Sequence, residues 1–265
     1  MKKYLLPLLF LITHTSFAQQ GLINDGVDVH VKNGLQLYMV GGSGADVNNL
    51  NSSLIQSSGT TSTIYIDGNM VNTGTINLDS SNISIKGNWT NTGTFNPGTS
   101  TVTFNGASAQ TIDHNGGNFY RIIINNSGGD TAFLLSSFVV DNLLQLLNGM
   151  VHTGLNDTIT LDDIASISGE ANGRFVAGVI QTLHTLSGPS ASTFGGMGIT
   201  ITPNGINLGD VTMIRTTGLD SAGVSYGFNP CITSFQGIDR VWDISSQNAP
   251  TGNINITFSW LSDND

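Results

Sequence analysis

A stretch of fourteen residues occurs twice in this chain, nineteen positions apart. Residues 64–77 (IYIDGNMVNTGTIN) and 83–96 (ISIKGNWTNTGTFN) are identical at nine positions. The changed pairs Met70/Trp89 and Ile76/Phe95 keep their apolar character. A period near 19 is shorter than that of the helical repeats, which run to roughly 33–47 residues, and it matches one coil of a β-solenoid. The repeat therefore predicts a fold made of stacked, similar coils.

Apolar and polar residues alternate within these units. Ile64 and Ile66, and later Ile83 and Ile85, are each separated by one residue, which is the strand period and places both side chains on one face. Asn-Gly and Thr-Gly pairs lie between the strands, and both Gly and Asn tolerate the positive φ of tight corners. We predict an all-β chain whose main part is a parallel β-helix. Antiparallel β-sandwiches, which show the same alternation, are the alternative.

A single coil cannot bury its apolar face, so neighbouring coils must share one core. If residues 25–172 supply about eight coils spaced by ~4.8 Å, the rod is roughly 38 Å long, with Ile64 and Ile83 meeting inside. Asn, Thr and Ser at equivalent corners are expected to stack into ladders, as in cross-β structure. Such ladders would suit a chain with only 10% charged residues and a single glutamate, Glu170.

Residues 1–18 are typical of an export signal. Lys2 and Lys3 precede an apolar stretch from Leu5 to Ile12, and Ser16-Phe17-Ala18 fits the small-x-small rule for cleavage after Ala18. The apolar stretch is shorter than the ~20 residues that span a bilayer. We therefore expect a secreted chain that has no membrane insertion after the signal is removed.

Three segments follow the signal. Residues 19–172 are interpreted as solenoid repeats, and within them 133–150 are read as strands rather than as a helix. Residues 173–233 are rich in turn signals and are interpreted as a β-rich end or cap of the solenoid. Residues 234–265 are interpreted as the start of a β-sandwich, because 254–260 alternate like a half-buried strand. We expect the native protein to continue beyond this segment.

The charge balance restricts the partners. The chain has 8 basic and 18 acidic residues, and loss of the two signal lysines leaves 6 − 18 = −12. Such a surface repels phosphate backbones and anionic lipids, which argues against nucleic-acid binding and membrane docking. Cys231 is the only cysteine, so no internal disulfide is expected, and we interpret it as a small buried apolar residue.

No catalytic, cofactor-binding or metal-binding residues are predicted. The sequence lacks a nucleophile elbow, a phosphate loop and an EF-hand calcium loop. The mature histidines His30, His114, His152 and His184 lie far apart, with no pair at zinc-ligand spacing. A polysaccharide lyase or hydrolase is an alternative, because enzymes of these classes often have a β-helix fold.

Such an enzyme needs acidic groups and a basic partner on one stacked face. Arg121, Arg174 and Arg215 are the candidates for the basic role, but no acidic residue recurs near them at the 19-residue spacing.

Glycan binding is a further alternative. Tyr65, Trp89 or Tyr120, if exposed, could stack on sugar rings. Trp89 takes the place of Met70 in the repeat, which favours a core or corner position for it instead.

Five segments resemble repetitive surface proteins of Bacteroidota: FNGASAQTI (104–112), FYRIIINNSGG (119–129), LLNGMVHTG (146–154), GDVTMIRTTG (209–218) and DRVWDI (239–244). In that family, adhesin-like β-rich regions lead to Ig-like domains and to a C-terminal sorting domain for type IX secretion. The resemblance implies display or secretion. Together with the repeats and the lack of catalytic motifs, we predict a secreted or cell-surface structural, adhesin-like stalk module without catalytic activity. Its partners would be surface glycans or other cell-surface proteins.

Three short motifs resemble the Asp-Ser/Thr-apolar sites of O-glycosylation in Bacteroidota. They are Asp130-Thr-Ala132, Asp157-Thr-Ile159 and Asp220-Ser-Ala222. If the motifs are used, the acceptors would be Thr131, Thr158 and Ser221, and all three would have to be exposed.

Overall fold

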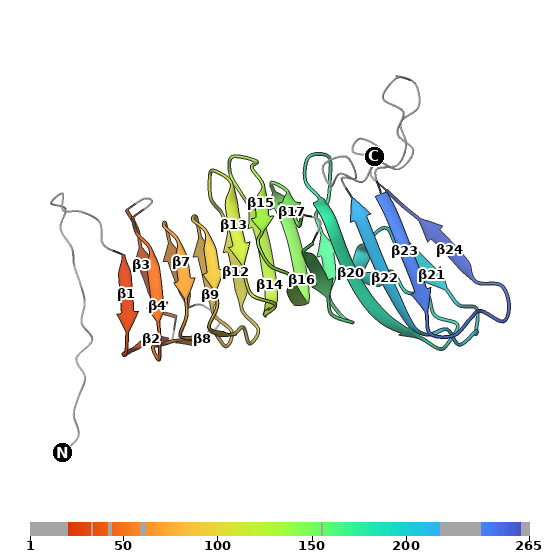
Figure 1. Cartoon of the computed structure of the whole chain (residues 1–265), viewed down its shortest axis with the longest axis horizontal. Helices are drawn as coiled ribbons and strands as arrows, with labels where there is room; N and C mark the ends of the chain where they lie inside the picture. Colours follow the sequence, from red (N-terminus) through yellow and green to blue (C-terminus); the bar gives the residue numbers. More distant parts are fainter. Residues whose placement is uncertain are drawn as a thin grey trace, which may run out of the picture.

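The computed structural model describes residues 21–217 and 240–260, except 33, 42–43, 59–61 and 155. The expected signal, Cys231 and Ser221 lie outside these residues. The described chain forms a parallel β-solenoid of about seven turns, followed by a small antiparallel sheet, and contains no α-helix (Figure 1). The predicted fold class is therefore confirmed, and the antiparallel alternative is wrong for the main body.

Three stacks of parallel strands, named faces A, B and C, make up the solenoid. Face A contains β1 (Leu22–Asp25), β4 (Val47–Leu50), β7 (Met70–Asn72), β10 (Trp89–Asn91), β13 (Gln110–Asp113), β15 (Ala132–Leu134), β17 (Val151–His152) and β20 (Val176–Leu186). Face B contains β2 (Asp28–Lys32), β5 (Leu54–Ser58), β8 (Thr75–Asn77) and β11 (Thr94–Asn96). Face C contains β3 (Gln36–Met39), β6 (Thr63–Ile66), β9 (Asn82–Ile85), β12 (Thr101–Phe104), β14 (Asn118–Asn125), β16 (Phe138–Asn148), β18 (Thr158–Leu161) and β19 (Ser166–Ser168). The long strand β20 pairs with both β17 and β18 and so joins faces A and C.

The two copies of the sequence repeat stack on each other in register. Ile64 pairs with Ile83 on face C, residue 70 with residue 89 on face A, and residue 76 with residue 95 on face B. Because the same offset of 19 holds on all three faces, the repeat is one complete coil. The predicted meeting of Ile64 and Ile83 in the core is confirmed, since both side chains are buried.

Coil length varies more than the repeat suggests. The parallel partners are 25 residues apart for Leu22 and Val47, 23 for Val47 and Met70, and 19 for Met70 and Trp89. Several coils have longer corners, so they use more residues per turn. This accounts for about seven turns in place of the expected eight.

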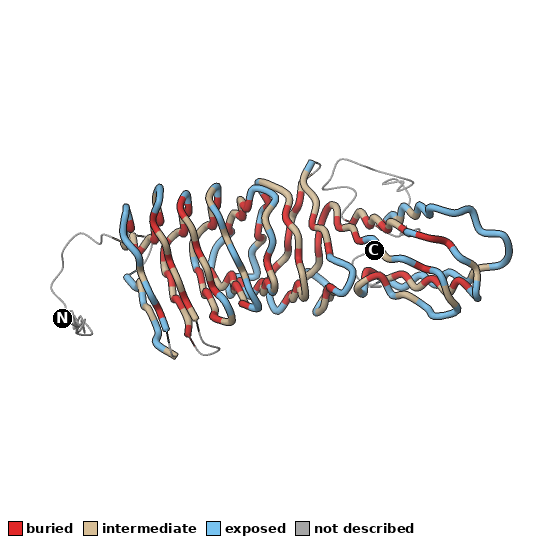
Figure 2. Tube along the Cα trace, turned by 90° about the horizontal axis from the view of Figure 1, so that it is seen from below, coloured by how far each residue is buried: buried red, intermediate tan, exposed pale blue. Residues whose placement is uncertain are grey.

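The alternating residues form a single apolar core along the solenoid. Ile66, Ile85 and Phe104, at stacked positions of face C, are each at most 1% exposed. Figure 2 shows the buried and less buried residues alternating along each coil. Full burial of such a side chain stabilises the fold by about 1.5–3 kcal/mol. Residues 133–150 join this core as strands, so the helical interpretation of that segment is wrong.

A ladder of buried side chains runs along the inner side of face A, near the ends of its strands. Asn24 donates from Nδ2 to Oδ1 of Asn49 at 2.7 Å, Asn49 to Asn72 at 2.7 Å, and Asn72 to Asn91 at 2.6 Å. His114 occupies the same position in the next coil, with Nδ1 3.5 Å from the Asn91 amide nitrogen. Each of the first three asparagines also donates to a backbone carbonyl. The predicted stacking of equivalent asparagines is confirmed, but this ladder lies at strand positions and not at the turns.

The pairing changes from parallel to antiparallel at β20. Its free edge takes up β22 (Gly209–Thr217), which pairs with β23 (Arg240–Ser246), both antiparallel. A second antiparallel pair consists of β21 (Ile199–Thr202) and β24 (Asn255–Phe258), and the short 3-10 helix η1 (Phe194–Gly196) precedes β21. The Trp242 indole links the two pairs, because its Nε1 donates to the Met197 carbonyl at 3.0 Å and its ring lies 5.1 Å from that of Phe258.

The last described strand is less buried than its sequence pattern predicts. Ile256, Phe258 and Trp260 are 39%, 42% and 47% exposed. Among the described residues β24 pairs only with β21, so it forms an edge of the antiparallel sheet. The strand itself is confirmed, but its half-buried face is not.

Candidate functional site

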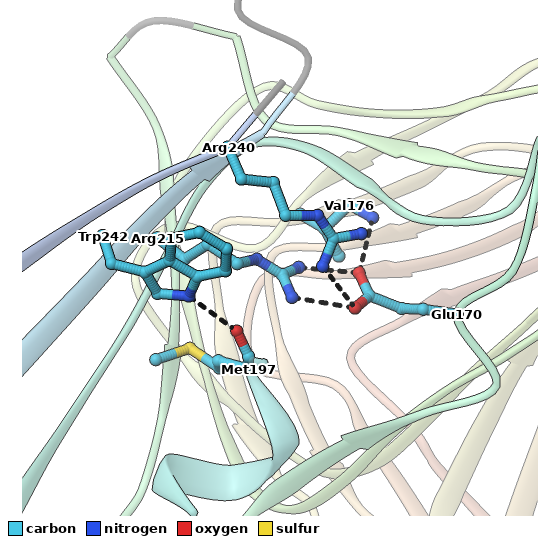
Figure 3. A network of polar contacts seen from close by, with 6 residues as sticks. All are labelled: Glu170, Val176, Met197, Arg215, Arg240 and Trp242. Carbon is cyan, nitrogen blue, oxygen red and sulfur yellow. Dashed lines mark hydrogen bonds and ion pairs between the residues drawn. The ribbon is translucent and has the colours of Figure 1, made fainter. Parts of the chain in front are cut away.

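A buried ion pair connects the last solenoid turn to the antiparallel sheet (Figure 3). Glu170 follows β19 in a turn, and Arg215 lies on β22. Arg215 Nη1 donates to Glu170 Oε2 at 2.8 Å and Nη2 to Oε1 at 2.6 Å, so the contact is bidentate. Arg240 Nη1 lies 3.9 Å from Oε2, and the Val176 backbone N–H donates to Oε1 at 3.2 Å. This Glu170 cluster joins three segments.

The strand period explains why an arginine lies in the core here. Val211, Met213 and Arg215 alternate on the buried side of β22. The Arg215 side chain is fully buried, whereas that of Glu170 is 12% exposed. An isolated guanidinium in such a place is costly, so the carboxylate is what allows it to be buried there.

The cluster keeps its carboxylate ionised. Burial by itself raises the pKa of the Glu170 carboxyl, whereas the charge and hydrogen bonds of Arg215 lower it. The Arg240 charge and the Val176 N–H act in the same direction, so the pKa lies below its usual value. Glu170 is therefore suited to holding segments together rather than to delivering a proton near neutral pH.

A cleft of about 240 Å³ opens beside the cluster. It is lined by Ile167, Ser168, Gly169, Glu170, Gly196, Gly198, Arg240, Ser259 and Trp260. The indole of Trp260 is half exposed at this cleft, together with two serine residues. Aromatic and hydroxyl groups of this kind are suited to contact with a sugar ring.

A second polar cleft of about 540 Å³ contains His184 and Ser192. The Ser192 Oγ lies 2.7 Å from His184 Nδ1 and also accepts the backbone N–H of Phe194 at 3.3 Å. Burial lowers the pKa of His184, while the charge of Asp163 acts against that change. The hydrogen bond from the Phe194 N–H explains the position of Ser192, because it stabilises the turn at the start of η1.

The three candidate arginines do not form one basic group. Arg121 donates to the Asn142 side chain at 2.9 Å. Arg174 donates to the backbone carbonyls of Gly169 and Leu147. In the part of the chain that the structure describes, only Arg215 of these three forms an ion pair with a carboxylate, and that partner is Glu170. The role of Glu170 was not predicted from the sequence. The signal that could have pointed to it is that it is the only glutamate of the chain.

The candidate sugar-stacking aromatics differ in exposure. Trp89 is fully buried, which confirms its expected core position. Tyr65 is half buried and stacks face to face on Tyr38, with ring centroids 4.6 Å apart and an angle of 5°. Tyr120 is half buried as well.

The glycosylation candidates are only partly described. Thr131 and Thr158 are half buried, and Thr158 lies within β18. Ser221 lies outside the described residues. Modification at these three positions stays a prediction.

The described residues contain no group of three His, Cys, Asp or Glu side chains arranged to hold a metal ion. Within the same residues, no helix has the length and apolar character needed to cross a membrane. Comparison of the chain with known protein families, curated proteins and solved structures found no match. The function must therefore be argued from the geometry of this chain alone.

Proposed function

We propose that the protein is a secreted cell-surface structural stalk, an adhesin-like module without catalytic activity. The observation that carries this proposal is the continuous stack of coils with its buried asparagine ladder. Backbone strands pair from β1 through β20, and side-chain hydrogen bonds join Asn24 to Asn91 along the same direction. Such an arrangement gives an elongated body whose length is set by the number of coils.

The surface and the ion pair support the same role. Few charges and a net charge of −10 favour solubility without attraction to nucleic acid or anionic lipid. The Glu170 cluster fastens the antiparallel sheet to the solenoid, so that a load at one part is passed to the other. We propose residues 1–18 as the export signal and a route like that of the type IX proteins that the chain resembles.

Glycan binding is the second candidate, and the cleft beside the Glu170 cluster favours it. Trp260, 47% exposed, would offer one ring face to a sugar, while Ser168 and Ser259 would hydrogen bond its hydroxyl groups. A glycan array probed with the purified chain and with Trp260→Ala tests this role. Binding that is lost in the variant supports it, and no binding to any glycan removes it.

Export and display are tested by expressing the full chain in a Gram-negative bacterium. We expect N-terminal sequencing to show that the exported protein begins at Gln19. We also expect an antibody against the protein to detect it on intact cells or in the medium. Leu9→Arg interrupts the apolar stretch and should keep the chain inside the cell. A wild-type chain that stays in the cytoplasm with Met1 intact would contradict the proposal.

A further inference from the structure

The first described coil has an unpaired edge on all three faces. β1, β2 and β3 each pair with the following coil, through β4, β5 and β6. No strand among the described residues lies on their other side. A row of free backbone N–H and C=O groups of this kind is a template for another strand.

Exposed apolar side chains are concentrated on this coil. Ile23, Val27, Leu35, Tyr38 and Val40 are between 54% and 63% exposed. They fall within 18 consecutive residues, whereas the other large exposed apolar residues are spread over the rest of the described chain. Concentrated apolar exposure marks a surface that is covered in use.

The asparagine ladder points to the same edge. In each later step of the ladder, the Oδ1 atom accepts the amide of the preceding coil. Asn24 is the first asparagine of the ladder and is fully buried, yet its Oδ1 has no hydrogen-bond partner. A buried acceptor without a donor costs about 1–3 kcal/mol. The ladder therefore lacks a donor on the side of the free edge.

We propose that this edge binds the same edge of a second copy, so that two solenoids join end to end around a two-fold axis. The axis passes through the middle of β2, near His30, and the two β2 strands pair in antiparallel fashion. The same rotation places β1 of each copy against β3 of its partner. The spacing permits this, because β1 ends five residues before His30 and β3 begins six residues after it.

Charge on β2 favours a second copy over another partner. Asp28, His30 and Lys32 are exposed and alternate with the more buried Val29 and Val31. In an antiparallel pair centred on His30, Asp28 of one copy lies opposite Lys32 of the other, and this contact occurs twice. Opposite charges on facing strand positions stabilise a pair, and like charges destabilise it. The sequence of β2 is thus complementary to itself.

The experiment measures the mass of the full exported chain by analytical ultracentrifugation across a range of concentrations. We expect a dimer that dissociates on dilution. Asp28→Lys places two lysines opposite each other at both contacts and should weaken the dimer at least tenfold. The double variant Asp28→Lys/Lys32→Asp restores opposite charges and should restore the dimer. Asp243→Lys, an exposed change on β23, is the control and should leave the dimer unchanged.

The outcomes are decisive. A wild-type chain that is monomeric at every concentration overturns the proposal, and would mean that the edge is covered by the chain's own residues or by another protein. A dimer that is equally stable in Asp28→Lys, or one that the double variant fails to restore, also overturns it. The inference rests on the solenoid and not on surface display, so a monomer would leave the proposed function standing.

Discussion

The indole N–H of Trp89 donates a hydrogen bond to Nδ1 of His114 in the next coil, at 3.1 Å. Because the indole nitrogen is only a donor, Nδ1 must be the unprotonated nitrogen of the ring. The ring proton then lies on Nε2, which is 3.2 Å from the Asn118 carbonyl. A neutral imidazole therefore continues the asparagine ladder, stacked on Phe119 with ring centroids 3.9 Å apart.

This histidine should make stability depend on pH. Burial lowers the pKa of His114 to about 4, against an ordinary value near 6.5. Between these values the unfolded chain binds a proton that the folded chain does not, so the free energy of unfolding falls as the pH falls. At about 1.4 kcal/mol per unit, we expect a loss of roughly 2–3 kcal/mol between pH 7 and 4.5. Urea denaturation at the two pH values measures it.

The matched variant His114→Asn places an amide in the ladder that does not titrate. We expect it to remove most of this pH dependence, whatever its effect on stability at pH 7. An unchanged difference between the two pH values would show that other groups cause the dependence.

The ladder should be sensitive at its centre. Asn72→Ala removes the hydrogen bond that Asn49 Nδ2 donates and the one that Asn91 Oδ1 accepts, and both of these atoms belong to buried side chains. Each such group costs about 1–3 kcal/mol, so we expect a loss of roughly 2–4 kcal/mol in the free energy of unfolding. Asn77→Ala is the control, because Asn77 bonds to Gln56 on the outer side of face B and should cost less than about 1 kcal/mol. Equal losses for the two variants would contradict this view of the ladder.

The Glu170 cluster should fail when its carboxylate is neutralised. Glu170→Gln leaves Arg215 fully buried without its counter-charge, and breaking a buried pair in this way costs about 3–5 kcal/mol. Because the pKa of Glu170 is lowered in the folded state, its contribution is present above its ordinary pKa and is lost as the pH falls through the folded value. Chemical denaturation at neutral pH measures the loss. Asp243→Asn, at an exposed strand position, should change stability by no more than about 0.5 kcal/mol.

Close contact between coils predicts a glycine requirement. A Cβ at Gly87 would lie 2.2 Å from the Gly68 carbonyl oxygen, at the stacked position one coil earlier. Gly87→Ala should force the two coils apart locally and cost about 1–3 kcal/mol. Gly188→Ala meets no atom within 4 Å and is the control. A thermal melt in which both variants match the wild type would rule out close stacking at this corner.

The solenoid could be predicted because its contacts repeat at short separation. Ile64 and Ile83 lie one coil apart, so the sequence shows both members of the contact at the same offset that the structure uses. The number of turns could not be predicted, because corner lengths vary while the strands keep their pairing. Exposure of residues 254–260 also escaped prediction, since alternation gives the face of a strand but not what covers it.

The Glu170 cluster could not be found from the repeat. Glu170 and Arg215 are 45 residues apart in the sequence. They meet only because the chain leaves the solenoid after β20 and returns as β22, which pairs antiparallel with β20. That contact depends on the change from parallel to antiparallel pairing, which no periodic pattern in the sequence specifies. The sequence shows a single glutamate, and it shows an arginine at a core position of a strand. It does not show that the two form a pair.

The strands of the solenoid run across the long axis of the molecule, so the bonds between coils point along that axis (Figure 1). Tension applied at the two ends therefore acts on these bonds by direct extension, one coil after another, rather than by sliding many strands past each other at once. Each coil that detaches would release 19 to 27 residues of chain. If the proposed stalk carries load, it would therefore lengthen in small increments, one coil at a time.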